Sequence, residues 1–171
     1  MLIDFYATFA VVCFTLLGLW LIIVQTRHAE WRHSSVHRRR SYGIALHFSF
    51  PGLMSVLSLV DPNSTALWRT SFAIVAVTGA VVLAAVRGPA ASRLGAASYV
   101  AAIALYVLIA VLAAFPRVLH GLGLDVRPLR VEAVLLSLLV FLGVNVAWLL
   151  LFEPAPTRPL DHGPQRKKAR R

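Results

Sequence analysis

The stretch RHAEWRHSSVHRRR, from Arg27 to Arg40, is the strongly charged segment between the first two long apolar runs of this chain. It carries five arginines and a single acidic residue, Glu30. Short arginine-rich loops stay on the cytoplasmic side of a membrane, because moving them across is costly and is opposed by the membrane potential. The stretch therefore predicts a polytopic membrane protein and the direction in which the neighbouring spans cross the bilayer.

The composition agrees with this interpretation. Of the 171 residues, 58% are hydrophobic and 14% are charged, whereas soluble domains carry about 45–50% apolar and about 25% charged residues. A net charge of +10 is also typical of proteins that bind nucleic acids. Here the basic residues flank apolar runs, which membrane orientation explains, so we expect the lipid bilayer and no nucleic acid as the partner.

Five apolar runs are each long enough to cross a hydrocarbon core about 30 Å thick. The predicted spans cover residues 5–25, 42–60, 67–86, 94–115 and 131–152. A secretory signal begins with positive charge, but the first run is preceded by Asp4 and no basic residue. The sequence therefore predicts an all-α bundle of five transmembrane helices, the first of which is retained.

The basic residues predict the orientation of these spans. All but four of the seventeen Lys and Arg residues fall on one predicted side, the exceptions being Arg69, Arg117, Arg127 and Arg130. We therefore expect residues 1–153 to form a transmembrane domain with its N-terminus outside, in a bacterial plasma membrane. Residues 154–171 are rich in proline and then basic, and we expect a disordered cytoplasmic tail.

An ionisable side chain lies inside the second predicted span. His47 is about five residues from the start of that span, and Pro51 four residues later removes the helical hydrogen bond to the His47 carbonyl, which predicts a kink. Asn145 of the fifth span falls at a similar depth, and Tyr99 of the fourth is a third candidate. These residues form the candidate intramembrane polar site, because buried polar groups in spans often mark transport pathways. The simpler alternative is one interhelical hydrogen bond, worth about 0.6–2 kcal/mol.

No cofactor or metal site is expected. His28, His33 and His37 cluster in the basic stretch, but no nearby Cys or Asp completes a ligand set. The single cysteine, Cys13, excludes an internal disulfide. The sequence also carries none of the short motifs of hydrolases, metalloproteases or nucleotide-binding enzymes.

Two basic clusters are suited to anionic lipid headgroups, which attract each Lys or Arg by about 1 kcal/mol. They are Arg38, Arg39 and Arg40, and Arg166, Lys167 and Lys168 in the tail. Their simpler role is to set the topology of the chain.

Three functional hypotheses remain open at this point. The first is an accessory or scaffold subunit that assembles with itself or another membrane protein through small-residue faces, such as Ala76, Ala80 and Ala84, or Ala97 and Ala101. The second is an oligomeric ion or small-solute transporter or channel that uses the second span. The third is a membrane redox protein that binds heme between His47 and His28.

Overall fold

The computed structural model describes residues 2–31, 34–61, 64–86, 93–117 and 128–152. Five of its helices are long and apolar enough to cross a membrane. They are α1 (Leu2–Thr26), α3 (Ser35–Val60), α4 (Thr65–Val86), α5 (Arg93–Ala114) and α7 (Pro128–Leu151), and the short helix α2 (His28–Trp31) follows α1. Each predicted span falls on one of the five long helices. The predicted tail, including Arg166, Lys167 and Lys168, lies outside the described residues.

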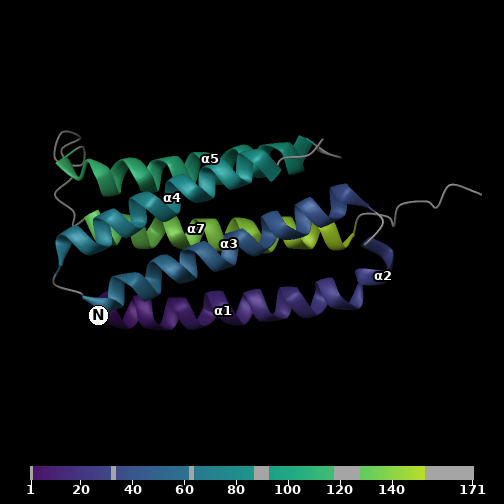
Figure 1. Cartoon of the computed structure of the whole chain (residues 1–171), viewed down its shortest axis with the longest axis horizontal. Helices are drawn as coiled ribbons and strands as arrows, with labels where there is room; N and C mark the ends of the chain where they lie inside the picture. The colour runs from purple at the N-terminus through teal and green to yellow at the C-terminus, as the bar shows by residue number, and fades with distance from the viewer. Residues whose placement is uncertain (1, 32–33, 62–63, 87–92, 118–127, 153–171) are drawn as a thin grey trace, which may run out of the picture.

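The long helices run side by side along the longest axis of the molecule (Figure 1). Helix α3 packs against α1, α4 and α7, and α5 packs against α4 and α7. Many large apolar side chains face outward, among them Ile22 on α1, Ile74 and Val81 on α4, and Phe141 on α7. An apolar surface around an apolar core is what lipid-exposed helices require.

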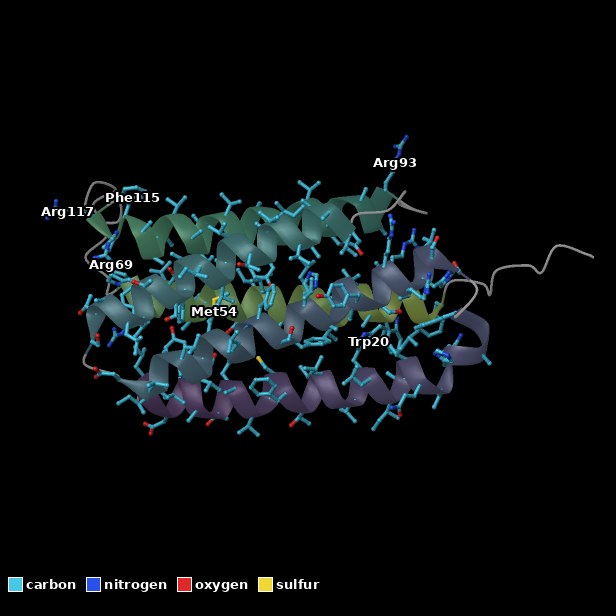
Figure 2. The ribbon with its side chains drawn as sticks, in the orientation of Figure 1. Trp20, Met54, Arg69, Arg93, Phe115 and Arg117 are labelled. Carbon is cyan, nitrogen blue, oxygen red and sulfur yellow. The ribbon has the colours of Figure 1, made fainter. Side chains whose placement is uncertain are left out.

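The two ends of the bundle differ in charge. The end that carries Arg38, called the Arg38 end below, also carries Arg27 and Arg93. Figure 2 shows Arg93 at this end and Arg69 and Arg117 at the opposite end. The opposite end is called the Tyr6 end, after the tyrosine near the start of α1.

Helix α3 begins seven residues before the predicted span at residues 42–60. Ser34 caps it, because its side chain accepts a hydrogen bond from the backbone N–H of His37. The three arginines Arg38, Arg39 and Arg40 are therefore helical rather than part of a loop. Hydropathy missed this extension because charged residues interrupt an apolar run without interrupting a helix.

Arg69 has a structural role that hydropathy does not reveal. Its Nε and one terminal nitrogen donate hydrogen bonds of 2.9 and 2.8 Å to the carbonyls of Ala113 and Ala114, at the end of α5. The last carbonyls of a helix lack helical donors and carry partial negative charge. Arg69 of α4 thus caps α5 and joins the two helices at the Tyr6 end.

Candidate functional site

His47 lies in the middle of α3 and is enclosed by the bundle, with 2% of its surface exposed. It packs against Gly143 of α7, where a Cβ atom would lie only 2.5 Å from the Cβ of His47. The absence of a side chain at Gly143 therefore allows α7 to approach this histidine. Because α3 begins at Ser35, ahead of the predicted span, His47 is about 18 Å from the start of the helix.

The hydrogen bond of the His47 ring determines which nitrogen can accept a proton. Its Nδ1 lies 2.8 Å from the carbonyl oxygen of Gly43. A carbonyl accepts only, so Nδ1 carries the hydrogen and, in the neutral ring, Nε2 has the free lone pair. Nε2 is buried and has no hydrogen-bond partner among the described residues. The core therefore encloses a nitrogen that can accept a proton.

Tyr99 of α5 approaches the same turn of α3. Its hydroxyl oxygen would lie 2.9 Å from a Cβ atom on Gly43, the residue whose carbonyl binds the His47 ring. The hydroxyl is buried and makes no hydrogen bond within the described part of the chain. The structure therefore places both Tyr99 and His47 next to Gly43, and these two members of the predicted set share one region.

Asn145 does not join them. Its side chain is exposed on α7, and its Nδ2 donates a 2.7 Å hydrogen bond to the carbonyl of Phe141 in its own helix. Gly143 faces His47, and two further residues turn a helix by about 200°. Asn145 therefore lies at a similar level but points away from α3, so the expected pairing with His47 is not made.

Pro51 is buried, and α3 continues through it as one helix to Val60. Two neighbouring groups add hydrogen bonds in this region. Tyr106 donates from its hydroxyl to the carbonyl of Leu46 at 3.0 Å, and Ser55 donates to the carbonyl of Pro51 at 2.8 Å. Neither bond goes to the carbonyl of His47, the group that Pro51 leaves without its helical donor, so they reinforce α3 on either side of that position.

Glu132 is a buried ionisable residue that sequence reasoning did not select. It lies one turn into α7 and is 0% exposed, although its sequence position indicated the edge of a span. Neither carboxyl oxygen has a hydrogen-bond partner in the described residues. Helical spacing could have identified it, because Glu132, Leu136, Leu139 and Gly143 recur on one face of α7 and are all buried.

Tyr6 of α1 lies next to this carboxyl group. The Tyr6 hydroxyl donates a 2.8 Å hydrogen bond to the carbonyl of Leu129, one turn before Glu132. The Tyr6 hydroxyl proton is therefore directed to the backbone and not to the carboxyl group. Glu132 remains enclosed without a donor that would stabilise its charged form.

Four buried polar side chains lie at intervals along α3, and a fifth lies on α7. Within the described residues, the core contains five such side chains other than tyrosine and tryptophan: Ser41, His47, Ser55, Ser58 and Glu132. Because α3 and α7 run in opposite directions and His47 lies opposite Gly143, Ser58 and Glu132 are expected at the same level, about 16 Å from His47. These side chains are spaced from Ser41, near the Arg38 end, to Ser58 and Glu132, near the Tyr6 end, with about 12 Å of helix between His47 and Ser55.

The histidines are not gathered into a set of metal ligands in the part of the chain that the structure describes. His28 lines a cavity at the Arg38 end that His47 does not reach, and His33 lies outside the described residues. No group of three His, Cys, Asp or Glu side chains in the described ranges is close enough to hold a metal ion. Heme ligation between His28 and His47 gains no support from this arrangement.

Comparisons of the chain with protein families, with curated proteins and with solved structures find no match.

Proposed function

We propose that this protein binds and transfers protons inside the membrane, with His47 and Glu132 as the two proton-binding groups. The observation that supports the proposal is that both side chains are enclosed while His47 Nε2 and both Glu132 oxygens have no partner among the described residues. Buried polar groups in proteins are almost always hydrogen-bonded. Ionisable groups inside membranes are costly to keep, which makes a function their first explanation.

The chemistry of the two groups is suited to this role. A glutamic acid in an apolar site is neutral and can release a proton, and the neutral His47 ring can accept one at Nε2. Transfer over about 16 Å requires intermediate hydroxyl groups or water. Ser55 and Ser58 supply buried hydroxyl oxygens on α3 near the level of Glu132, and both donate their protons to backbone carbonyls of α3. Ser55 is about 12 Å from His47 along the helix, so water must complete the path between them. The pathway proposed is therefore Glu132, the two serines and His47, with Tyr99 next towards the Arg38 end.

Proteoliposomes test this function. The full chain is reconstituted with an internal pH-sensitive dye, and a potassium diffusion potential of either sign drives proton movement. We expect proton flux above that of protein-free vesicles, and flux at the protein-free level for Glu132→Gln and His47→Gln. Asn145→Leu is the matched control, because it removes an exposed polar side chain of α7 near the level of His47.

Each variant is also examined by size-exclusion chromatography before and after heating, so that loss of folding is distinguished from loss of flux. Wild-type flux equal to that of protein-free vesicles at both signs of the potential refutes the proposal. Undiminished flux in folded Glu132→Gln and His47→Gln refutes it as well.

An accessory or scaffold role is a second candidate, supported by the outer face of α5. Ala97, Ala101 and Ala104 are exposed there, whereas Ala76 of α4 and Ala102 of α5 are buried inside the bundle. Small residues on an exposed face allow another helix to approach closely. Ala101→Phe should therefore disrupt a complex with a second copy or another membrane protein in mild detergent, while Ala85→Phe on α4 should not. A particle that is monomeric and without partner opposes this candidate.

The orientation proposed is that the Arg38 end faces the cytoplasm of a bacterial cell, so that the N-terminus lies outside and the C-terminus inside. The support is the concentration of arginines at the Arg38 end, which follows the rule for cytoplasmic loops. Cys13 is buried and should not react with a membrane-impermeant thiol reagent. Cysteines are therefore introduced singly at Thr65 and at Arg39, and the reagent is added to intact cells. We expect labelling at position 65 only, and the reverse result refutes this orientation.

A further inference from the structure

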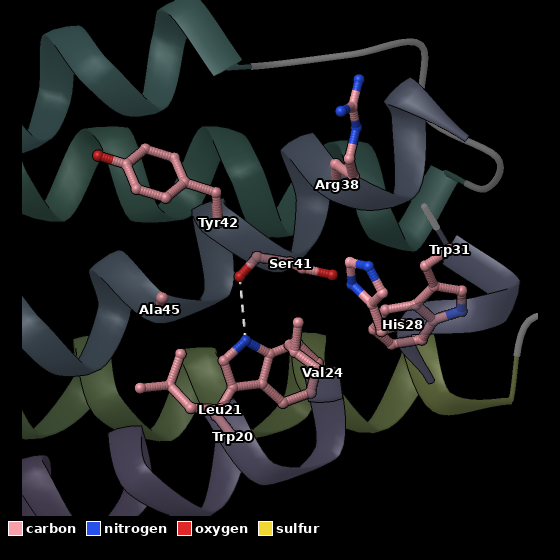
Figure 3. A pocket seen from close by; sticks show the side chains of 9 residues that line it. All are labelled: Trp20, Leu21, Val24, His28, Trp31, Arg38, Ser41, Tyr42 and Ala45. Atoms are coloured by element: carbon pink, nitrogen blue, oxygen red, sulfur yellow. Dashed lines mark hydrogen bonds between the residues drawn. The ribbon is translucent and has the colours of Figure 1, made fainter. Parts of the chain in front are cut away.

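A cavity of about 310 Å³ opens at the Arg38 end, between α1, α2 and α3. Its walls are mostly apolar and include Leu21 and Val24 of α1 and Ala45 of α3. Figure 3 shows these side chains together with the polar groups at the mouth. Neither His47 nor Glu132 lines this cavity.

Two tryptophans hold the cavity in shape. Trp20 and Trp31 are 2% and 4% exposed, and their ring centroids lie 6.3 Å apart. The Trp20 Nε1 donates a 3.0 Å hydrogen bond to the carbonyl of Ser41, which joins α1 to α3 (Figure 3). Because the indole is fixed by this bond, it forms a rigid wall and supplies no donor to a ligand.

Polar groups are present at one side of this apolar space. The Ser41 hydroxyl is buried, lacks a hydrogen-bond partner in the described structure, and points towards the His28 ring in Figure 3. The residue is only 6% exposed. Arg38 lines the mouth, where its side chain is exposed and extends away from His28 in Figure 3. The cavity thus combines apolar walls, an enclosed hydroxyl donor and a cationic rim.

We propose that this cavity binds one anionic phospholipid of the surrounding bilayer. An acyl chain contacts Leu21, Val24 and Ala45, the Ser41 hydroxyl donates to an ester oxygen, and the phosphate lies beside His28 and Arg38. Charge supports an anionic headgroup over a neutral one. Of the acidic residues in the described ranges, only Glu30 belongs to this end, whereas Asp4, Asp61 and Glu132 belong to the Tyr6 end.

Native mass spectrometry of the full chain in detergent tests the site. Phosphatidylglycerol and phosphatidylcholine with the same acyl chains are titrated separately, and glycerol 3-phosphate serves as the headgroup without chains. We expect one phosphatidylglycerol to be retained more tightly than phosphatidylcholine, and no retention of glycerol 3-phosphate. Equal retention of the two phospholipids overturns the proposal, and so does retention of glycerol 3-phosphate alone.

Neighbouring arginines provide the matched pair of variants. Arg38→Gln should weaken phosphatidylglycerol binding about fivefold, whereas Arg39→Gln removes the same charge from an exposed position outside the cavity lining and should leave binding unchanged. Ala45→Phe fills the cavity and should abolish retention, while Ala97→Phe on α5 should not. Equal effects of Arg38→Gln and Arg39→Gln indicate diffuse attraction to the basic end and overturn the proposal.

Discussion

The replacement Gly143→Ala should separate α7 from α3 at the level of His47. A Cβ atom at position 143 would lie 2.5 Å from His47 Cβ, 3.2 Å from His47 Cγ and 3.2 Å from Phe48 Cε1. Carbon atoms in contact are ordinarily about 3.5–4.0 Å apart, so the closest pair must move apart by about 1.0–1.5 Å. Both Cβ atoms are attached directly to the backbone, and no side-chain rotation relieves the overlap.

The helices themselves must therefore shift, and overpacking of this kind costs about 1–3 kcal/mol. For a chain of this length, each kcal/mol corresponds to a change in Tm of about 2–4 °C. We expect Gly143→Ala to lower the temperature at which the detergent-solubilised protein loses its monodisperse peak in size-exclusion chromatography by about 2–12 °C.

Gly18→Ala is the control for this experiment. It makes the same chemical change in the interior of α1, where an added Cβ atom meets nothing within 4 Å. Alanine has a higher helix propensity than glycine, so this variant should match or exceed the wild type by up to about 1 kcal/mol. The reasoning is refuted when Gly143→Ala is as stable as Gly18→Ala.

Three further predictions use the same thermal assay. Arg69→Gln should lower the free energy of unfolding by about 1–3 kcal/mol, because it removes the charged donors to the carbonyls at the end of α5. The control Arg130→Gln, at an exposed residue of the same end, should have little effect, and equal losses of stability would contradict the capping role. Tyr6→Phe should cost about 0.5–1.5 kcal/mol by removing its hydrogen bond to α7, whereas Tyr42→Phe, at a side chain that is 54% exposed, should be neutral. Glu132→Leu should raise the free energy of unfolding by about 1–3 kcal/mol, since it removes a buried carboxyl group without a hydrogen-bond partner among the described residues. It should also abolish proton flux. A Glu132→Leu variant less stable than the wild type would contradict this prediction and indicate that the carboxyl group has a structural partner.

The sequence predicts the five apolar helices because their length and hydropathy are set by the thickness of the bilayer. It also draws attention to His47 within the second span, since charge-bearing side chains are rare within apolar runs, but it does not predict whether the ring faces the bundle, a cavity or lipid. It does not predict the direction in which Asn145 points, because direction depends on rotation about the axis of α7. The α7 helix presents Gly143 to α3, and that rotation places Asn145 at the surface.

Glu132 was missed for a different reason. Hydropathy defines a span by its apolar interior, and a carboxylate near one end is then assigned to the boundary. The structure extends α7 back to Pro128 and covers its first turns with Tyr6 of α1. Glu132 is buried by a helix that lies more than 120 residues earlier in the chain. A pattern of neighbouring residues cannot predict a contact over that separation.

The cap at Ser34 has a consequence for the three arginines that follow it. In a loop, Arg38, Arg39 and Arg40 would be interchangeable carriers of charge. On a helix, successive residues are turned by about 100°. Here the first arginine lines the cavity, the second is exposed outside the cavity lining, and the third is half-buried. One extra residue inserted between Arg40 and Gly43 would keep the charge of the segment and the hydropathy of the span, yet it would rotate every arginine into its neighbour's direction. The direction in which each of these arginines points therefore depends on the helical register of the segment as well as on its number of charges.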